Sequence, residues 1–223
     1  MMSKLLLLTT FIGCMFLFSF KGEKKKKILF FGDSITQMGV DKGGYIDIIK
    51  QELIKKGVAE NYEIIGAGIG GNKIYDLFLR MEKDVLAQHP DVVVIWVGVN
   101  DVWHKSSHGT GTDYDKFGLF YDAVVKKLQA QGIKVILVTP AAIGERTDFS
   151  NSQDGDLNMY SNWIRKYSDD NALGLVDLRK TFHEYSVANN PKNEEKGILT
   201  TDRVHLNVKG NAFVAEQMWN AIK

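Results

Sequence analysis

From residue 28 onward, short apolar runs alternate with longer segments of helical periodicity, and this alternation constrains the fold more than any other feature. The runs lie at residues 28–31, 62–65, 92–97, 135–138 and 173–176. They are dominated by β-branched, aliphatic or aromatic residues without strict alternation, which is typical of strands buried on both faces of a parallel sheet. Five such runs separated by helices predict a three-layer α/β domain with a five-stranded parallel sheet.

The segments between the runs carry apolar residues at helical spacing. Residues 45–56, for example, place Ile48, Ile49 and Leu53 on one face, and Gly57 follows as a suitable end to the helix. Similar patterns predict helices at residues 74–87, 115–131, 156–169 and 207–222. Since no repeat, low-complexity stretch or linker interrupts residues 28–223, we expect them to form one domain.

The formal net charge of +1 conceals two unlike parts of the chain. Residues 1–27 hold six of the 28 basic residues and one of the 27 acidic residues, so the remainder carries a net charge of −4. A mildly acidic domain argues against a nucleic-acid-binding surface.

Residues 5–20 form an uncharged, mostly apolar run that follows Lys4. This run is shorter than the about 20 residues of a spanning helix and resembles a signal-peptide core. We therefore expect residues 1–22 to be a signal peptide or N-terminal anchor, residues 23–27 to be a basic spacer, and the domain to be exported to the periplasm or secreted.

Two alternatives to cleavage of the leader stay open. Phe11-Ile12-Gly13-Cys14 loosely resembles a bacterial lipoprotein lipobox, so Cys14 is a candidate for lipidation. A retained membrane anchor is the second alternative, although the lysines that follow the run oppose export of that side. Cys14 is the only cysteine, which excludes an internal disulfide and a Cys-based zinc site.

Small and polar residues follow the predicted strands, where ligands bind in parallel α/β sheets. The first strand ends in Gly32-Asp33-Ser34-Ile35-Thr36 and the third in Gly98-Val99-Asn100-Asp101. The second is followed by a glycine-rich stretch that ends at Gly71-Asn72, and Asp202-Arg203-Val204-His205 precedes the last helix.

These four blocks resemble the SGNH, or GDSL, family of serine esterases and lipases, over residues 27–222. Ser34 matches the family's nucleophile, Gly71 and Asn100 its block II glycine and block III asparagine, and Asp202 with His205 its block V pair. The resemblance implies a flavodoxin-like parallel sheet and a catalytic triad of Ser34, His205 and Asp202. It also implies an oxyanion hole made by the N–H groups of Ser34 and Gly71 and by the Asn100 amide.

The same residues make chemical sense without the family. Serine is a weak nucleophile until a base takes its proton, and His205 is the natural base. Asp202 lies three residues earlier, so its carboxylate can reach back to the imidazole and orient it. We interpret Asp33 and Asp101 as structural residues that bind local backbone.

Other motifs compete with this interpretation. Gly66-x-Gly68-x-x-Gly71 fits a dinucleotide-binding pattern, but it follows the second strand, and no acidic residue ends the next strand. His104 and His108 are four residues apart and could bind a metal, yet their segment lacks helical periodicity, so we expect a solvent-exposed loop and no metal site. This loop is expected to wall the cleft, with Trp103 and His104 as candidate substrate contacts. Glu145, Arg146 and Asp148 could face the same cleft.

The expected function is hydrolysis of carboxylic esters through an acyl-enzyme intermediate, without metal or organic cofactor. A polar, aromatic-containing loop and an export signal favour O-deacetylation of a saccharide. The alternatives are a short-chain lipid esterase, a lysophospholipase or a thioesterase. A ligand-binding module on the same scaffold is the non-enzymatic alternative. The expected partner is a small-molecule or saccharide ester, with membrane contact only through the N-terminal segment, and the sequence leaves the oligomeric state open.

Overall fold

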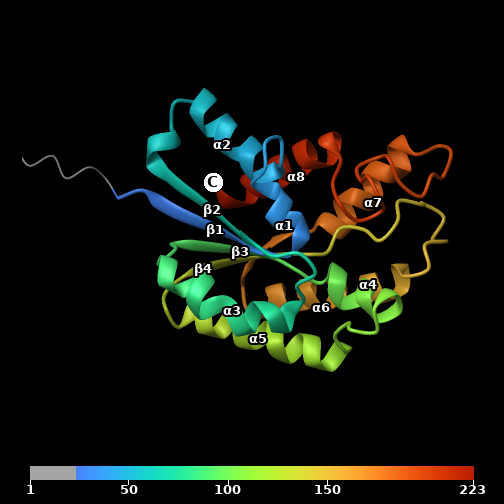
Figure 1. Cartoon of the computed structure of the whole chain (residues 1–223), viewed down its shortest axis with the longest axis horizontal. Coiled ribbons are helices and arrows are strands. Elements are labelled where there is room, and N and C mark those ends of the chain that lie inside the picture. Colours follow the sequence, from blue (N-terminus) through green and yellow to red (C-terminus); the bar gives the residue numbers. More distant parts are fainter. Residues whose placement is uncertain (1–23) are drawn as a thin grey trace, which may run out of the picture.

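Five parallel strands in the order β2-β1-β3-β4-β5 form the central sheet (Figure 1). The strands are β1 (Lys26–Gly32), β2 (Tyr62–Gly68), β3 (Val92–Trp96), β4 (Lys134–Val138) and β5 (Gly174–Val176). The computed structural model describes residues 24–223. Each of the five apolar runs forms a strand, so the α/β class and the five-stranded parallel sheet are confirmed.

Helices cover both faces of this sheet (Figure 1). One layer holds α1 (Ser34–Gly39), α2 (Tyr45–Lys55), α7 (Leu178–Asn189) and α8 (Val208–Ile222). The other holds α3 (Ile74–Asp84), α4 (Val99–Ser107), α5 (Tyr114–Gln129) and α6 (Asp154–Asp170). Short 3₁₀ turns, η1 (Ala59–Asn61) and η2 (Leu86–Gln88), precede β2 and β3.

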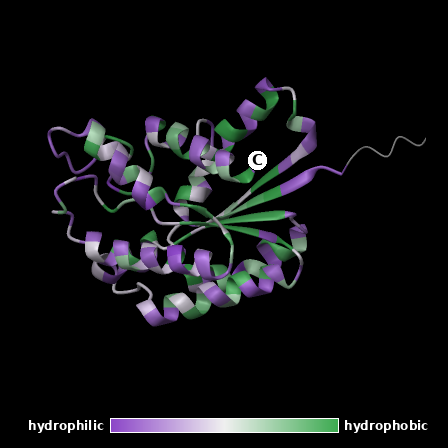
Figure 2. Cartoon of the chain, turned by 180° about the vertical axis from the view of Figure 1, so that it is seen from behind, coloured by the Kyte–Doolittle hydropathy of each residue, from purple (hydrophilic) through white to green (hydrophobic). Residues whose placement is uncertain are grey.

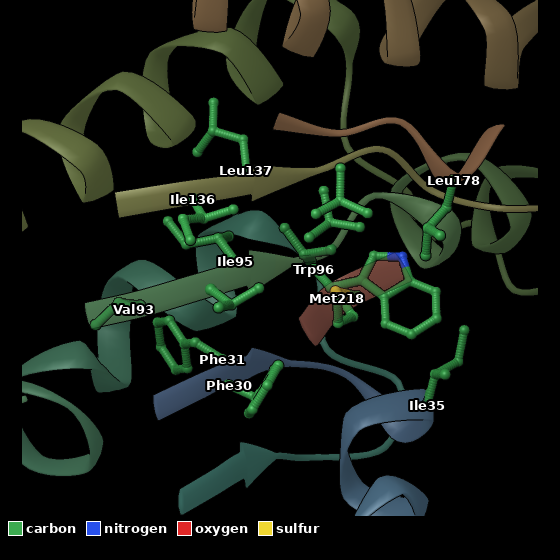
Figure 3. Close-up of a cluster of buried hydrophobic side chains, with 14 of the residues drawn as sticks. Phe30, Phe31, Ile35, Val93, Ile95, Trp96, Ile136, Leu137, Leu178 and Met218 are labelled. Atoms are coloured by element: carbon green, nitrogen blue, oxygen red, sulfur yellow. The ribbon is translucent and has the colours of Figure 1, made fainter. Parts of the chain in front are cut away.

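The three central strands β1, β3 and β4 bury side chains on both faces, which explains their continuous apolar runs, whereas the edge strands β2 and β5 are only partly buried. Phe30 packs edge-on against Tyr45 of α2, with ring centroids 5.5 Å apart, whereas Phe31 lies beneath Arg80 of α3 on the opposite face. Figure 3 shows Phe30 and Phe31 with side chains of β3 and β4 and with Met218 of α8. Full burial of a phenylalanine contributes about 1.5–3 kcal/mol. The hydropathy colouring accordingly shows apolar strands between helices whose outer faces are polar (Figure 2).

The first strand begins earlier than expected. Lys26 and Lys27, assigned to a solvated basic spacer, are the first two residues of β1. The Lys27 N–H donates to Asp91 Oδ2 at 2.7 Å, and its Nζ donates to the Gln88 carbonyl at 2.9 Å. These hydrogen bonds extend the strand at its N-terminal end, before the apolar residues begin. The expected signal peptide or anchor and Cys14 lie outside the described residues. Within residues 24–223, none of the helices has the length and apolar character needed to cross a membrane.

The topology determines where a ligand can bind. The chain leaves β1 for helices on one face of the sheet and leaves β3 for helices on the other, although β1 and β3 are neighbours. Their carboxyl ends therefore flank a topological switch point, the usual ligand site of open α/β sheets. Ser34 lies two residues after the end of β1, and Asn100 lies four residues after the end of β3.

Candidate active site

Ser34, His205 and Asp202 form a hydrogen-bonded chain at this edge of the sheet. Ser34 Oγ lies 2.9 Å from His205 Nε2, and His205 Nδ1 lies 2.7 Å from Asp202 Oδ2. Because a carboxylate only accepts hydrogen bonds, Nδ1 carries the imidazole proton and Nε2 presents its lone pair to the serine. The three residues are thus arranged for proton transfer from Ser34 to His205.

The Asp202 carboxylate is fixed by the turn that follows it. Oδ1 accepts from the N–H groups of Val204 at 3.1 Å and His205 at 2.8 Å. Partial burial opposes ionisation of this group, but the hydrogen bonds from His205 and Val204 outweigh it and hold the pKa of Asp202 below its usual value. Asp202 is therefore ionised at neutral pH, and its carboxylate can orient the His205 imidazole.

Arg203, inside this turn, has a φ of +88°, which is costly for a residue with a Cβ, on the order of 1–3 kcal/mol. Its carbonyl accepts from Gly144 N–H at 3.0 Å, and its Nη1 donates to Glu195 Oε1 at 2.7 Å. The Gly144 contact fixes the backbone of this turn and keeps Asp202 and His205 facing each other, whereas the Glu195 pair holds the Arg203 side chain at the surface.

Glu145 anchors the segment that precedes the turn. The side chain is buried, and its two oxygens accept from the consecutive N–H groups of Ile198, Leu199 and Thr200 at 2.8, 2.6 and 2.9 Å. The expectation that Glu145 faces the cleft is therefore wrong, because both of its carboxylate oxygens accept hydrogen bonds from backbone N–H groups. No local signal in the sequence identifies this role, because its partners lie more than fifty residues away.

Gly71 lies in the loop after β2 with a φ of +75°, a conformation that favours glycine. A Cβ at this position would lie 3.7 Å from Cε1 of His104, so the imidazole stands over the glycine. Within residues 24–223, the Gly71 N–H donates to no protein acceptor. It is free to bind a ligand oxygen.

Asn100 is buried in the first turn of α4. Its Nδ2 donates to the Asn72 carbonyl at 3.1 Å, which fixes the plane of the amide and leaves its second N–H for another acceptor. Ser34 is the first residue of α1, so its N–H has no partner inside that helix. The structure thus places Ser34, Gly71 and Asn100 at the ends of three adjacent strands, each with a donor to spare.

Two buried carboxyls lie behind these residues. Asp33 caps α1 by accepting from the Ile35 N–H at 3.0 Å, and burial, with a smaller contribution from the Asp101 charge, raises its pKa to about 7. Burial also raises the pKa of Asp101 to about 6, although Asp101 accepts from Ile74 N–H and Thr112 Oγ1. Asp33 therefore binds local backbone as expected, whereas Asp101 binds α3 across the site.

The expected loop around His104 and His108 is instead the helix α4 and its C-terminal cap. His104 and His108 have ring centroids 4.4 Å apart, and Trp103 lies edge-on to His205 at 6.4 Å. Burial, with the charges of Lys73 and His108, lowers the pKa of His104, so its imidazole is neutral near pH 7. Among the described residues, no cluster of three His, Cys, Asp or Glu side chains could hold a metal ion.

Comparison with known proteins places this geometry in a family. Residues 30–213 match the model of the GDSL-like lipase/acylhydrolase family. The chain belongs to this family. Its resemblance to SGNH/GDSL esterases is thereby confirmed, and the chain is an ester hydrolase rather than a binding module on the same scaffold.

Several esterases resemble this chain along most of its length. A protein described as an acetyl xylan esterase is 65% identical, with a TM-score of 0.88 over 88% of this chain and 100% of that one. An acetylxylan esterase of Geobacillus stearothermophilus is 28% identical over 208 residues, 85% of this chain and 90% of the relative. The structure of a catalytic mutant of Axe2, an acetylxylan esterase from the same organism, has a TM-score of 0.78 at 26% identity and covers 88% of this chain and 94% of that one.

Three variants of the Geobacillus enzyme are described as catalytic mutants, each with alanine in place of a serine, an aspartate or a histidine. The aspartate and the histidine in that protein are three positions apart.

Proposed function

We propose that Ser34 is the nucleophile of this ester hydrolase, that His205 is its general base and acid, and that Asp202 orients His205. The observation that carries the proposal is the continuous chain from Asp202 Oδ2 through the imidazole to Ser34 Oγ. The spacing of the aspartate and histidine catalytic mutants in the Geobacillus enzyme equals that between Asp202 and His205, which supports the same assignment.

In the acylation step, Ser34 Oγ attacks the ester carbonyl while its proton passes to His205 Nε2. The N–H groups of Ser34 and Gly71 and the free N–H of Asn100 bind the oxyanion that forms. His205 then gives the proton to the leaving alcohol, and the acyl group stays on Ser34. A water molecule repeats the attack with His205 as base and releases the carboxylic acid. No step draws on a metal or cofactor.

The substrate of this reaction is an acetyl ester on a carbohydrate. This part of the proposal is supported by the 65% identity to a protein described as an acetyl xylan esterase. A human relative, 24% identical, is named as a homolog of an isoamyl acetate-hydrolysing esterase, so a small acetate ester is the second candidate.

The substrate contacts are Trp103 and His104. Trp103 stands beside His205, where its ring can stack on a sugar, and His104 stands over Gly71, where it bounds the acyl side. Neither residue donates to Ser34 or His205, so both are assigned to substrate selection rather than to proton transfer.

The apolar leader supports a location outside the cytoplasm, where polymeric saccharides are met. A Bacillus subtilis relative, 30% identical over 138 residues, is named a lipoprotein. Lipidation at Cys14 therefore stays a candidate fate of the leader beside cleavage by signal peptidase.

A substrate panel tests the proposal. Acetylated xylo-oligosaccharides, a small aryl acetate, a lysophospholipid and an acyl thioester are compared by kcat/KM. We expect the acetylated saccharides to give the highest value. A preference for the lysophospholipid or thioester would overturn the substrate class, and a protein inactive on all four would overturn the esterase assignment.

A further inference from the structure

Arg80 on α3 uses its guanidinium to join three segments of the chain. Nη2 donates to the carbonyls of Gly32 at 2.8 Å and Ala67 at 3.0 Å, and Nε donates to Asn72 Oδ1 at 2.7 Å. The acceptors come from the end of β1, the end of β2 and the loop after β2. One side chain thus holds the tips of two neighbouring strands and the loop that bears Gly71.

The position of these acceptors connects Arg80 to the proposed chemistry. Gly32 lies two residues before Ser34, and Asn72 directly follows Gly71. Asn72 is held twice, because its side-chain oxygen accepts from Arg80 and its backbone carbonyl accepts from Asn100 Nδ2 at 3.1 Å. Arg80 therefore reaches all three proposed oxyanion donors. It binds Gly32 near Ser34 and Asn72 next to Gly71, and Asn72 in turn binds Asn100.

The guanidinium itself has little freedom to move. Its side chain is 13% exposed, its Nη1 pairs with Asp84 at 2.9 Å, and its Cζ lies 4.5 Å from the centroid of the Phe31 ring. The planar fork of arginine can satisfy such divergent acceptors at once, whereas the single ammonium of lysine cannot. Without Arg80, two carbonyls and an amide oxygen lose their charged donor.

We propose that Arg80 is a positioning residue for the oxyanion hole. It fixes the Gly71 loop and the Asn100 amide at the distance from Ser34 that binding of the oxyanion requires. This inference rests on the proposed function of Ser34, Gly71 and Asn100. Arg80 touches neither His205 nor Asp202, so its contribution is to transition-state binding and not to proton transfer.

Steady-state kinetics of Arg80→Lys on an aryl acetate provide the first test. A displacement of catalytic groups by about 1 Å can cost about 10²-fold in rate, so we expect kcat to fall about 10–100-fold. KM should stay within about twofold, and the pH dependence of kcat/KM should keep its midpoint, because the base is untouched.

Arg179→Lys is the matched control. Arg179 is also buried and bonds a backbone carbonyl (Ala141), an asparagine (Asn158) and an aspartate (Asp154), but it lies on α7 and none of these partners belongs to the segments that carry the oxyanion donors. We expect this variant to lose thermal stability and to keep kcat within about threefold of the wild type.

Two further measurements separate positioning from a general loss of structure. Methylboronic acid forms a tetrahedral adduct with a serine, so its affinity for Arg80→Lys should fall by about the same factor as kcat/KM. For Arg80→Ala, added methylguanidinium should restore part of kcat, whereas methylammonium should not.

The outcomes are distinguishable. Unchanged kcat and boronate affinity in Arg80→Lys, or an equal loss of kcat in Arg179→Lys, would overturn the role of Arg80 while leaving Ser34 as nucleophile. A wild-type protein that neither hydrolyses the aryl acetate nor binds the boronate would instead overturn the proposed function. If Arg80→Ala does not fold, Arg80→Lys alone decides the inference.

Discussion

At the scale of single residues, the account depends on the two nitrogens of His205. One faces Asp202 Oδ2 and the other faces Ser34 Oγ, and the side chain is 24% exposed. Removing the imidazole therefore removes the base without opening the hydrophobic core. We expect His205→Ala to lower kcat by about 10³-fold or more while the melting temperature stays close to that of the wild type. Near-normal turnover in this variant would exclude His205 as the base.

Trp103 makes a separate prediction about substrate selection. If its ring stacks on a sugar, Trp103→Ala should raise KM for an acetylated xylo-oligosaccharide about tenfold, or about 1.4 kcal/mol. The kcat/KM for a small aryl acetate, which has no sugar to stack, should stay within about threefold. Equal losses on both substrates would show that Trp103 supports the His205 ring rather than a saccharide.

At the scale of elements, the turn that carries Asp202 and His205 is held from outside by Glu145. In Glu145→Gln, one acceptor oxygen becomes an NH₂ group that faces a backbone N–H, so at least one buried donor loses its partner. We expect the free energy of unfolding to fall by about 1–3 kcal/mol, measured by urea denaturation, together with a loss of kcat.

Glu195→Gln is the control for Glu145 on the same segment. Glu195 pairs with Arg203 and Arg146 at the surface, where its side chain is 41% exposed, so its loss should cost less than about 1 kcal/mol. If both variants lose stability equally, the buried contacts of Glu145 do not determine the conformation of the turn.

The elements also show what local sequence can predict. Buried parallel strands are continuous apolar runs, so all five could be located from the sequence. The sequence predicts a loop where α4 forms, because the buried face of its first turn includes the polar residues Asn100 and Asp101. Helix α7 was missed in the same way, since Arg179 and Ser186 lie on its buried face. Polar residues on buried faces hide helical periodicity.

The residues of the candidate site also differ in whether a local sequence motif identifies them. Ser34, Gly71, Asn100, Asp202 and His205 could be predicted because each lies in a short motif at a strand end or before the last helix. Arg80 and Glu145 could not, because the Arg80 bond to Gly32 spans 48 residues and the Glu145 bond to Ile198 spans 53, so these groups become neighbours only in the folded protein.

At the scale of the whole molecule, burial of Asp33 links stability to pH. Its pKa is raised from 3.8 to about 7, so between these values the folded state binds more protons than the unfolded state. Stability from this group is present at low pH and is lost as the pH rises toward 7, by at most about 1.4 kcal/mol per pH unit. Asp33→Asn keeps a carbonyl for the Ile35 N–H and cannot titrate.

Urea denaturation across this range checks the linkage. Relative to the wild type, Asp33→Asn should become more stable as the pH rises from about 5 to about 8. The exposed Asp115→Asn should instead track the wild type across the range. Parallel curves for Asp33→Asn and the wild type would show that Asp33 is ionised in the folded state at neutral pH.

The central claim is that this esterase acts through Ser34, and covalent labelling tests it most directly. The wild-type protein is treated with a fluorophosphonate, its residual activity on an aryl acetate is followed, and the labelled peptide is mapped by mass spectrometry. We predict one label, on Ser34, with activity lost in proportion to labelling and with neither label nor activity in Ser34→Ala. Full activity in the labelled protein or in Ser34→Ala, or a label on another residue, would contradict the account.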